Sequence, residues 1–328
     1  MNESMISIII ATRDRAALLA ATLDAISWQE PPGCPCEIIV VDNASVDDTA
    51  AVIAAAAACS PFPIRYLLET RPGKSHALNT AVEHARGALF VLTDDDVLPS
   101  SHWLTAYARA FEQTGADFAV GRILPLWEAP PPRWLSPALY GVLAIPDGGE
   151  RRLMLARGLN EHIMPLGANM AVRRRVVVRV GGWNPELGKL QGTLRTGEDH
   201  QFALEMLETG FSGVYEPDAS VHHRVPAERL RLAYFQRWYY DNGGIDAQLE
   251  YQFPRTSRYL LGVPRYLWRQ FASDFCSAAL GIATLDAQRA AAGWMRTVWA
   301  AGYLRARWRR RPRRPAHVKP HPATAPRS

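Results

Sequence analysis

The sequence predicts an α/β fold whose mainly parallel central sheet is flanked by helices. Short runs of β-branched residues alternate with segments of helical periodicity in the amino-terminal part of the chain, which is typical of strand–helix–strand units. These runs are apolar throughout, as in strands that are buried on both faces. Aspartates follow two of the runs, at the edge where open α/β sheets bind their ligands.

The predicted elements succeed one another along the first 120 residues. Strands are expected at residues 6–10, 37–41, 64–68 and 88–93, and helices at residues 16–28, 47–59 and 75–86. Leu19, Leu23 and Ile26 have helical spacing in the first helix, and alanine, the best helix former, dominates the second. Residues 1–120 are therefore expected to form the nucleotide-binding half of an α/β domain.

The carboxyl-terminal part also has a helical pattern. Between residues 264 and 304, aromatic residues such as Trp268 and Phe271 stand among Arg265, Arg269 and Asp274. Such an amphipathic layer suits a membrane surface. It suits equally a helix pair that packs on the rest of the chain or on another subunit.

Most of the basic character lies at the end of the chain. The formal net charge is +5, and residues 305–328 contain nine Lys or Arg and no acid, so the first 304 residues are net negative. Because each basic residue near an anionic bilayer contributes about 1 kcal/mol, this tail is a candidate membrane contact. A disordered solubilising end is the alternative. We expect no nucleic-acid partner.

Composition favours a cytoplasmic protein. The four cysteines form neither a CxxC pair nor a regular framework. The amino terminus lacks the basic region and cleavage site of a signal peptide. The longest uncharged run, residues 49–64, contains two prolines and does not resemble a membrane span. Attachment to the cytoplasmic face of the membrane would then be peripheral.

The triplet Asp94-Asp95-Asp96 is the strongest candidate for a functional site. Three adjacent carboxylates repel one another unless a cation relieves them, and hard oxygen ligands favour Mg²⁺ or Mn²⁺. At the carboxyl end of a buried strand, such an ion could hold a diphosphate. A solvated acidic turn is the alternative.

Two common nucleotide-binding classes do not fit the sequence. No GxGxxG follows the first strand, which disfavours a dinucleotide-binding dehydrogenase. Gly73-Lys74-Ser75 resembles the end of a P-loop, but the required earlier glycine is replaced by Leu68. A sheet with acids at its strand ends remains, with Arg13, Arg15 and Lys74 available to neutralise phosphate.

Seven short blocks carry a family resemblance. Residues 7–15 read SIIIATRDR, 37–45 EIIVVDNAS, 71–79 RPGKSHALN, 92–96 LTDDD, 167–171 GANMA, 197–199 GED and 223–226 HRVP. In this order they resemble the GT-A glycosyltransferases of family 2 over residues 5–244. The resemblance implies a GT-A catalytic domain, residues 1–244, with a nucleotide-sugar half (1–120) and an acceptor half (121–244). A helical extension (245–304) and the tail (305–328) follow.

The resemblance also implies how a donor is held. The residues similar to the family's nucleotide-sugar contacts, together with the basic residues beside them, are Ala11, Thr12, Arg13, Arg15, Asp42, Lys74, Asp94 and Asp95. A UDP-sugar is the expected donor. Asp96, with Asp94 or Asp95, is expected to hold Mn²⁺ or Mg²⁺, and His223 could join them. For Asp42 a capping role in the following turn is the alternative.

Glu198 and Asp199 are the candidate catalytic pair. They open a predicted helix, and the resemblance assigns Asp199 as the general base that accepts the proton of an acceptor hydroxyl. One base and one displacement imply inversion at the anomeric carbon. Favourable charge at a helix amino terminus, typically 0.3–1 kcal/mol, is the alternative explanation for both acids.

Four residues are expected on the acceptor side. Asn169 and Met170 resemble the family's acceptor-side turn, and Trp127 and Trp134 offer flat faces that could stack on a sugar ring. Core packing explains both tryptophans almost as well.

The predicted function is metal-dependent, inverting transfer of a sugar to a glycan or lipid-linked acceptor, in cell-surface polysaccharide or glycoconjugate synthesis. A noncatalytic sugar-nucleotide-binding or scaffolding protein of the same fold is the alternative. A nucleotidyltransferase is disfavoured because residues 11–15 contain no glycine for a triphosphate loop.

Overall fold

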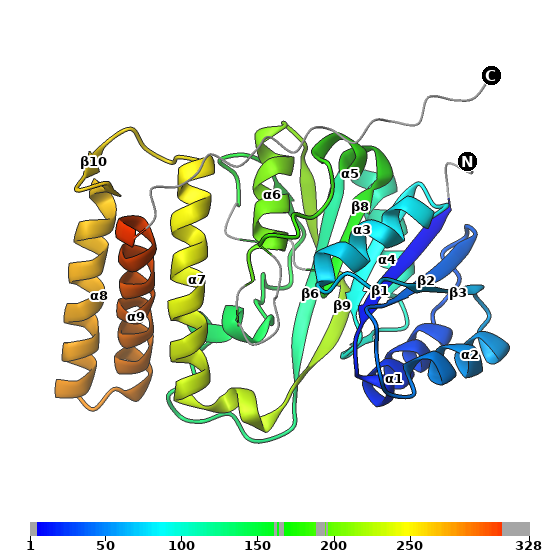
Figure 1. Cartoon of the computed structure of the whole chain (residues 1–328), viewed down its shortest axis with the longest axis horizontal. Helices are drawn as coiled ribbons and strands as arrows, with labels where there is room; N and C mark the ends of the chain where they lie inside the picture. Colours follow the sequence, from blue (N-terminus) through cyan, green and yellow to red (C-terminus); the bar gives the residue numbers. More distant parts are fainter. Residues whose placement is uncertain (1–4, 161–162, 164–166, 188–193, 195, 310–328) are drawn as a thin grey trace.

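The computed structural model describes residues 5–160, 163, 167–187, 194 and 196–309 (Figure 1). In this part of the chain, a nine-stranded sheet has the order β3-β2-β1-β4-β8-β6-β9-β5, with β7 paired to β9. Its strands are β1 (Ile6–Thr12), β2 (Cys36–Asp42), β3 (Ile64–Leu68), β4 (Leu89–Asp94), β5 (Val97–Pro99), β6 (Phe118–Trp127), β7 (Leu153–Leu155), β8 (Asn169–Arg173) and β9 (Gly213–Val225). The helices around it are α1 (Ala16–Ser27), α2 (Thr49–Cys59), α3 (Lys74–His84), α4 (Trp103–Thr114), α5 (Arg174–Val180) and α6 (Glu198–Glu208), with the 3-10 helices η1 (Pro137–Leu143) and η2 (Ala227–Leu230).

The predicted alternation of strands and helices is confirmed for the amino-terminal half. β1 pairs in parallel with both β2 and β4, and β2 pairs in parallel with β3. In this register Thr12 lies opposite Asp42, and Ala11 opposite Asp94. The carboxyl ends of β1, β2 and β4 therefore meet at one edge of the sheet.

Both faces of the sheet are buried, as the continuous apolar strands predicted. Ile8 and Ile10 of β1 pack in one core cluster with Leu23 of α1. Ile9, which points to the opposite face, packs in a second cluster with Leu78 of α3. Burial of each such side chain contributes about 1.5–3 kcal/mol, so the strand ends rest on a well-packed support.

The second half makes the sheet mixed. β8 is antiparallel to β4 and β6, whereas β9 is parallel to β6 and antiparallel to the short strand β5. β5 follows the acidic triplet directly, and its Val97 lies opposite His223 of β9. The register thus brings a histidine from late in the chain beside the three aspartates.

The carboxyl-terminal helices stand beside the sheet domain. They are α7 (Leu232–Gln252), α8 (Arg265–Ala283) and α9 (Ala287–Arg309), with the hairpin β10 (Tyr259–Leu260) and β11 (Val263–Pro264) before α8. α9 lies between α7 and α8 and contacts both (Figure 1). Among the described residues, no helix combines the length and the hydrophobicity that a transmembrane segment requires.

Two expected boundaries fall inside helices. Residue 244 lies within α7, and the basic segment expected from residue 305 begins within α9. Arg305 donates a hydrogen bond to the Tyr240 hydroxyl, and Arg307 donates one to the Gly262 carbonyl. The first arginines of this segment are therefore part of the helical extension, and residues 310–328 lie outside the described residues.

Candidate active site

A pocket of roughly 740 Å³ opens at the carboxyl ends of β1 and β4. Its walls come from these strand ends, from the starts of α3 and α6, from η1, and from α7. The pocket joins the acidic triplet to Glu198 and Asp199, which are about a hundred residues later in the sequence. The pocket lies at the sheet edge where the strand-end aspartates predict a ligand.

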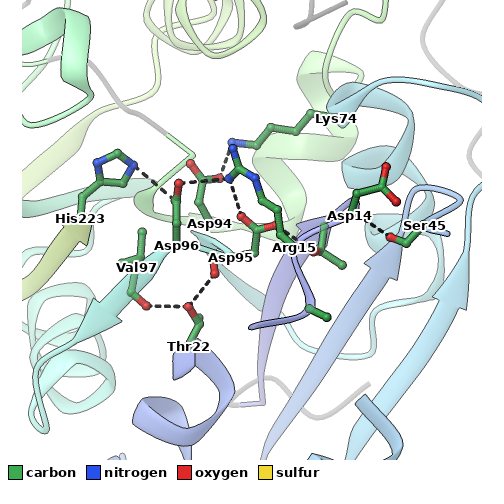
Figure 2. A network of polar contacts seen from close by, with 12 residues as sticks. Asp14, Arg15, Thr22, Ser45, Lys74, Asp94, Asp95, Asp96, Val97 and His223 are labelled. Atoms are coloured by element: carbon green, nitrogen blue, oxygen red, sulfur yellow. Dashed lines mark hydrogen bonds and ion pairs between the residues drawn. The ribbon is translucent and has the colours of Figure 1, made fainter. Parts of the chain in front are cut away.

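The three aspartates do not share one role. Asp95 accepts hydrogen bonds from the Thr12 hydroxyl and from Arg15, each at 2.8 Å. The backbone carbonyl of Asp95 accepts a hydrogen bond from Thr22, and Arg15 also reaches Asp96 at 3.1 Å (Figure 2). Arg15 therefore relieves part of the charge repulsion in the triplet, and Asp95 is turned toward the loop after β1.

Asp94, Asp96 and His223 form a candidate metal site. Each offers a ligand atom that lies within 4.8 Å of the others, and Nε2 of His223 is 3.3 Å from Oδ1 of Asp96. His223 is 2% exposed, and its Nδ1 has no hydrogen-bond partner among the described residues. Carboxylate donors with an imidazole fit Mn²⁺ and, less well, Mg²⁺. The geometry pairs Asp96 with Asp94 rather than with Asp95.

The surroundings keep Asp96 ionised. Burial opposes its ionisation, but the hydrogen bond to His223 and the charges of His223, Arg15 and Arg229 outweigh burial and hold the pKa of Asp96 well below its ordinary value. A metal ligand must be deprotonated, and Asp96 meets this requirement at neutral pH.

Lys74 is presented by a fixed turn. Gly73 donates its N–H to Oδ1 of Asn43 at 2.7 Å and has a φ of 127°, which favours glycine. Lys74 then begins α3, and its ammonium contacts Asp94. Burial opposes the charge of Lys74, but nearby carboxylates, that of Asp94 foremost, raise the pKa of Lys74 well above its ordinary value. A permanent cation thus faces the pocket.

The two carboxylate oxygens of Asp199 each accept a hydrogen bond. Its Oδ2 accepts the Gly167 N–H at 2.9 Å, and its Oδ1 accepts the indole N–H of Trp183 at 3.1 Å. The Trp183 ring in turn stacks on Phe202 of α6. A Cβ at Gly167 would lie 3.0 Å from the Lys74 ammonium and 3.1 Å from Asp199, so only glycine leaves this space open.

Glu198 lies deeper than Asp199. It is 4% exposed, and its Oε2 has no hydrogen-bond partner among the described residues. Burial and the adjacent charge of Asp199 raise the pKa of Glu198 to about 7, although Lys74 opposes the rise. Glu198 is therefore partly protonated near neutral pH.

This pKa predicts a stability that falls with pH. The unfolded chain releases the Glu198 proton near pH 4.5, whereas the folded protein holds it to about pH 7. Between these values the folded state binds more protons, so this group costs stability as pH rises through the interval, in total about 3 kcal/mol. We expect Glu198→Gln to unfold at higher denaturant than wild type at pH 8 and equally at pH 4.5. Equal midpoints at both pH values would contradict the assignment.

The structure separates the expected donor residues into two groups. Ala11, Thr12, Arg13 and Arg15 line the pocket together with Lys74 and the triplet. Asp42 does not line it: the side chain is buried, accepts hydrogen bonds from the Tyr66 hydroxyl and the Ser45 N–H, and stabilises the turn after β2. Its neighbour Asn43 lines the pocket instead.

The expected acceptor residues lie behind the pocket. Asn169 is fully buried, and its amide group bonds the indole of Trp103, the Tyr107 hydroxyl and two backbone carbonyls. Met170 is fully buried in the core. Because every polar atom of the Asn169 amide is already engaged, direct contact with an acceptor does not fit this geometry.

The two candidate tryptophans, Trp127 at the end of β6 and Trp134 in the segment after it, pack within the protein and do not line the pocket. The Trp127 ring lies edge-to-face on Tyr140, and the Trp134 ring lies edge-to-face on Phe235, with centroids 5.8 and 5.0 Å apart. Both tryptophans rest on the main core cluster. Core packing, the alternative explanation, is thus the arrangement observed.

One face of α7 supplies pocket residues that the sequence argument missed. Tyr234, Trp238, Asn242 and Asp246 all line the pocket. Their constant spacing of four puts them on one helix face. The mixture of aromatic and polar residues at this spacing was the available signal, since a core-facing stripe would be apolar throughout.

Comparison with known proteins identifies the family. The model of "Glycosyl transferase family 2" matches residues 7–180. The chain belongs to this family and is a glycosyltransferase that uses a nucleotide sugar. It is 26% identical to the succinoglycan biosynthesis protein ExoM of Rhizobium meliloti over 251 aligned residues. The alignment covers 76% of this chain and 76% of ExoM. It is 30% identical to the glycosyltransferase AglE of Haloferax volcanii over 36% of this chain and 39% of AglE.

Solved structures share the fold. The mannosyltransferase PcManGT from Pyrobaculum calidifontis, in complex with GDP-Man and Mn²⁺, superposes with a TM-score of 0.64 at 21% identity, over 94% of this chain and 88% of PcManGT. S. aureus TarS 1–349 in complex with UDP-GlcNAc gives a TM-score of 0.53 at 15% identity, over 93% of each chain. The expected GT-A-like α/β fold is confirmed.

Proposed function

We propose that this glycosyltransferase is metal-dependent and inverting, and that it transfers a sugar to a hydroxyl of a glycan or lipid-linked glycan. The observation that carries the proposal is that Asp94, Asp96 and His223 line the same pocket as Asp199 at the amino terminus of α6. ExoM, named for succinoglycan biosynthesis, supports a role in the synthesis of a polysaccharide or glycoconjugate.

The donor diphosphate is assigned to the side of the triplet. Asp94, Asp96 and His223 would hold Mn²⁺ or Mg²⁺, which when bound neutralises the charge on the leaving nucleoside diphosphate. Lys74, which contacts Asp94, adds a fixed positive charge beside the triplet. Such a preorganised charge does not have to reorganise during the reaction as solvent would. We assign the base and ribose to Ala11 and Thr12 at the end of β1, to the following Arg13, and to Asn43.

The acceptor is assigned to the side of Asp199. Its carboxylate accepts the proton of the attacking hydroxyl while the new bond to the anomeric carbon forms. The bond from that carbon to the phosphate oxygen breaks, and its electron pair leaves with the nucleoside diphosphate. Attack from the face opposite the leaving group inverts the anomeric configuration.

A donor panel tests this function. UDP-, GDP-, dTDP- and CDP-sugars are incubated with the full chain and Mn²⁺, with and without glycan acceptors, and nucleotide release is measured. We expect release from one class of donor, a UDP-sugar by the family resemblance, and inverted configuration in the product. Release from no donor, together with retained donor binding, would support the noncatalytic alternative.

We also propose that the helical extension contacts an anionic membrane surface. Leu260 and Leu261 at the β10–β11 hairpin are 50% and 70% exposed, and Trp308 at the end of α9 is 58% exposed. The Trp308 indole donates a hydrogen bond to the Leu261 carbonyl, so the three side chains form one surface. The Lys and Arg residues of 310–328 continue from this end of α9, and basic charge complements anionic lipid.

A vesicle assay tests this contact. We expect Leu260→Ser/Leu261→Ser to reduce co-sedimentation of the full chain with phosphatidylcholine–phosphatidylglycerol vesicles by at least about tenfold, because each buried leucine contributes about 1.5–3 kcal/mol. Val178→Ser, at another exposed apolar position, is the control and should bind as wild type. Equal sedimentation of all three proteins would contradict the hairpin contact.

A further inference from the structure

A second pocket adjoins the catalytic pocket. It measures roughly 250 Å³ and lies among α6, α7, α8 and α9. His200 and Asp246 line both pockets, with Nδ1 of His200 3.6 Å from Oδ1 of Asp246. The Trp299 indole donates a hydrogen bond to Oδ2 of Asp246 at 2.7 Å. This His200–Asp246 pair therefore lies at the boundary between the two pockets. His200 directly follows Asp199 in the sequence.

α7 forms a continuous wall of both pockets. Trp238 and Asn242 line the catalytic pocket, Asp246 lines both, and Glu250 lines the second pocket, as does Phe253 directly after the helix. At 1.5 Å per residue, Trp238 and Glu250 are about 18 Å apart along the helix. The wall is thus long enough for a short oligosaccharide whose one end reaches Asp199.

The lining of the second pocket suits a neutral, hydroxylated ring. Tyr266 and Trp299 provide aromatic surface, and Glu250 provides a carboxylate acceptor. Tyr303 is 1% exposed, and its hydroxyl is buried with no hydrogen-bond partner among the described residues. Buried hydroxyls are normally paired, so Tyr303 offers a donor and an acceptor to a ligand.

The charges of this pocket argue against a phosphate group. The lining contains the carboxylates of Asp246 and Glu250 against one guanidinium, that of Arg255. The pocket therefore has no excess of positive charge that would attract an anion. Glu250 already accepts the backbone N–H of Arg255, which fixes its orientation. Aromatic surface with a few placed polar groups is the usual composition of a small-molecule site.

We infer that the second pocket binds a sugar unit of the acceptor that is next to the unit attacked at Asp199. The preferred acceptor is then an oligosaccharide that lies along α7, with one ring in the catalytic pocket and a further ring against Trp299, Glu250 and Tyr303. This inference rests on the proposed function, because it assigns the acceptor class of the same enzyme.

The test uses variants that remove single polar groups. Tyr303→Phe deletes a hydroxyl that has no partner within the described chain, so we expect an unchanged melting temperature. Glu250→Gln removes the charge at nearly constant shape. Tyr251→Phe, on the same helix but outside both pockets, is the control.

The full-length proteins, with UDP and Mn²⁺, are applied to an array of mono- to tetrasaccharides of glucose, galactose, mannose and N-acetylglucosamine. We expect wild type to bind an oligosaccharide more tightly than any monosaccharide. Tyr303→Phe and Glu250→Gln should each weaken that binding about three- to tenfold, and monosaccharide binding and nucleotide release without acceptor should not change.

Two results would overturn the inference: no preference of wild type for oligosaccharides, or equal oligosaccharide binding by Tyr303→Phe, Glu250→Gln and Tyr251→Phe. Nucleotide release by wild type is measured as well, so that failure of the acceptor subsite can be distinguished from failure of the proposed function. If wild type releases nucleotide from a donor while the variants bind oligosaccharides normally, only the acceptor subsite is wrong. If wild type releases none, the proposed function itself fails.

Discussion

Asp199→Asn is expected to lower the rate of sugar transfer by about 10²–10⁴-fold, the contribution of a positioned general base. An amide cannot accept the proton of the attacking hydroxyl. Donor binding should change less than the rate, because Asp199 is not one of the metal-site residues Asp94, Asp96 and His223. The Asp199 carboxylate is hydrogen-bonded to Gly167 and Trp183. The measurement is kcat for transfer, together with the dissociation constant of the donor.

The matched control for this variant is Glu208→Gln at the other end of α6. Glu208 is partly exposed and pairs with Arg157 at the surface, a contact worth about 0–1 kcal/mol. It should therefore leave both kcat and donor affinity unchanged. Full turnover by Asp199→Asn would contradict the assignment of Asp199 as the general base. It would not affect the assignment of the donor site.

Asp96→Asn is expected to weaken Mn²⁺ binding by at least about 10²-fold and to abolish most transfer, since even residues that only support metal ligands affect affinity 10–100-fold. The same change leaves His223, Arg15 and Arg229 without their shared carboxylate. Breaking such a buried pair typically costs 3–5 kcal/mol, so the melting temperature should fall too.

Asp95→Asn separates the two effects. Asp95 is as buried as Asp96 and also pairs with Arg15, but it faces Thr12 rather than His223. Its loss should lower the melting temperature and leave Mn²⁺ affinity within a few-fold of wild type. The measurement is Mn²⁺ titration by electron paramagnetic resonance in the presence of nucleotide. Equal loss of Mn²⁺ affinity in both variants would contradict the assignment of Asp94, Asp96 and His223.

The strand ends could be predicted from the sequence because local patterns determine them. Continuous β-branched runs mark buried parallel strands, and parallel strands bring their carboxyl ends to one edge. The position of Asp94 beside the end of β1 follows from these two rules. Asp42 sits at the same edge but turns toward Tyr66, and the backbone alone does not determine which way a side chain turns.

The pocket wall that α7 contributes could not be predicted in the same way. Trp127 and Trp134 were candidates because flat aromatic rings suit sugars, but the same rings also fill cores, and both pack on the core cluster. Tyr234 and Trp238 of α7 line the pocket instead. The position of α7 involves its contacts with α9, and contacts between elements are not visible in a local sequence pattern.

Thermal unfolding of wild type with UDP-, GDP-, dTDP- and CDP-sugars, each with Mn²⁺ or with a chelator, tests the central claim most directly. A ligand that binds only the folded state adds about 2.7 kcal/mol at a hundred times its dissociation constant. We predict that one class of donor raises the melting temperature with Mn²⁺ and not with chelator, and that Asp96→Asn loses this shift. An equal shift with chelator, or no shift with any donor, would contradict a metal-dependent nucleotide-sugar site at Asp94 and Asp96.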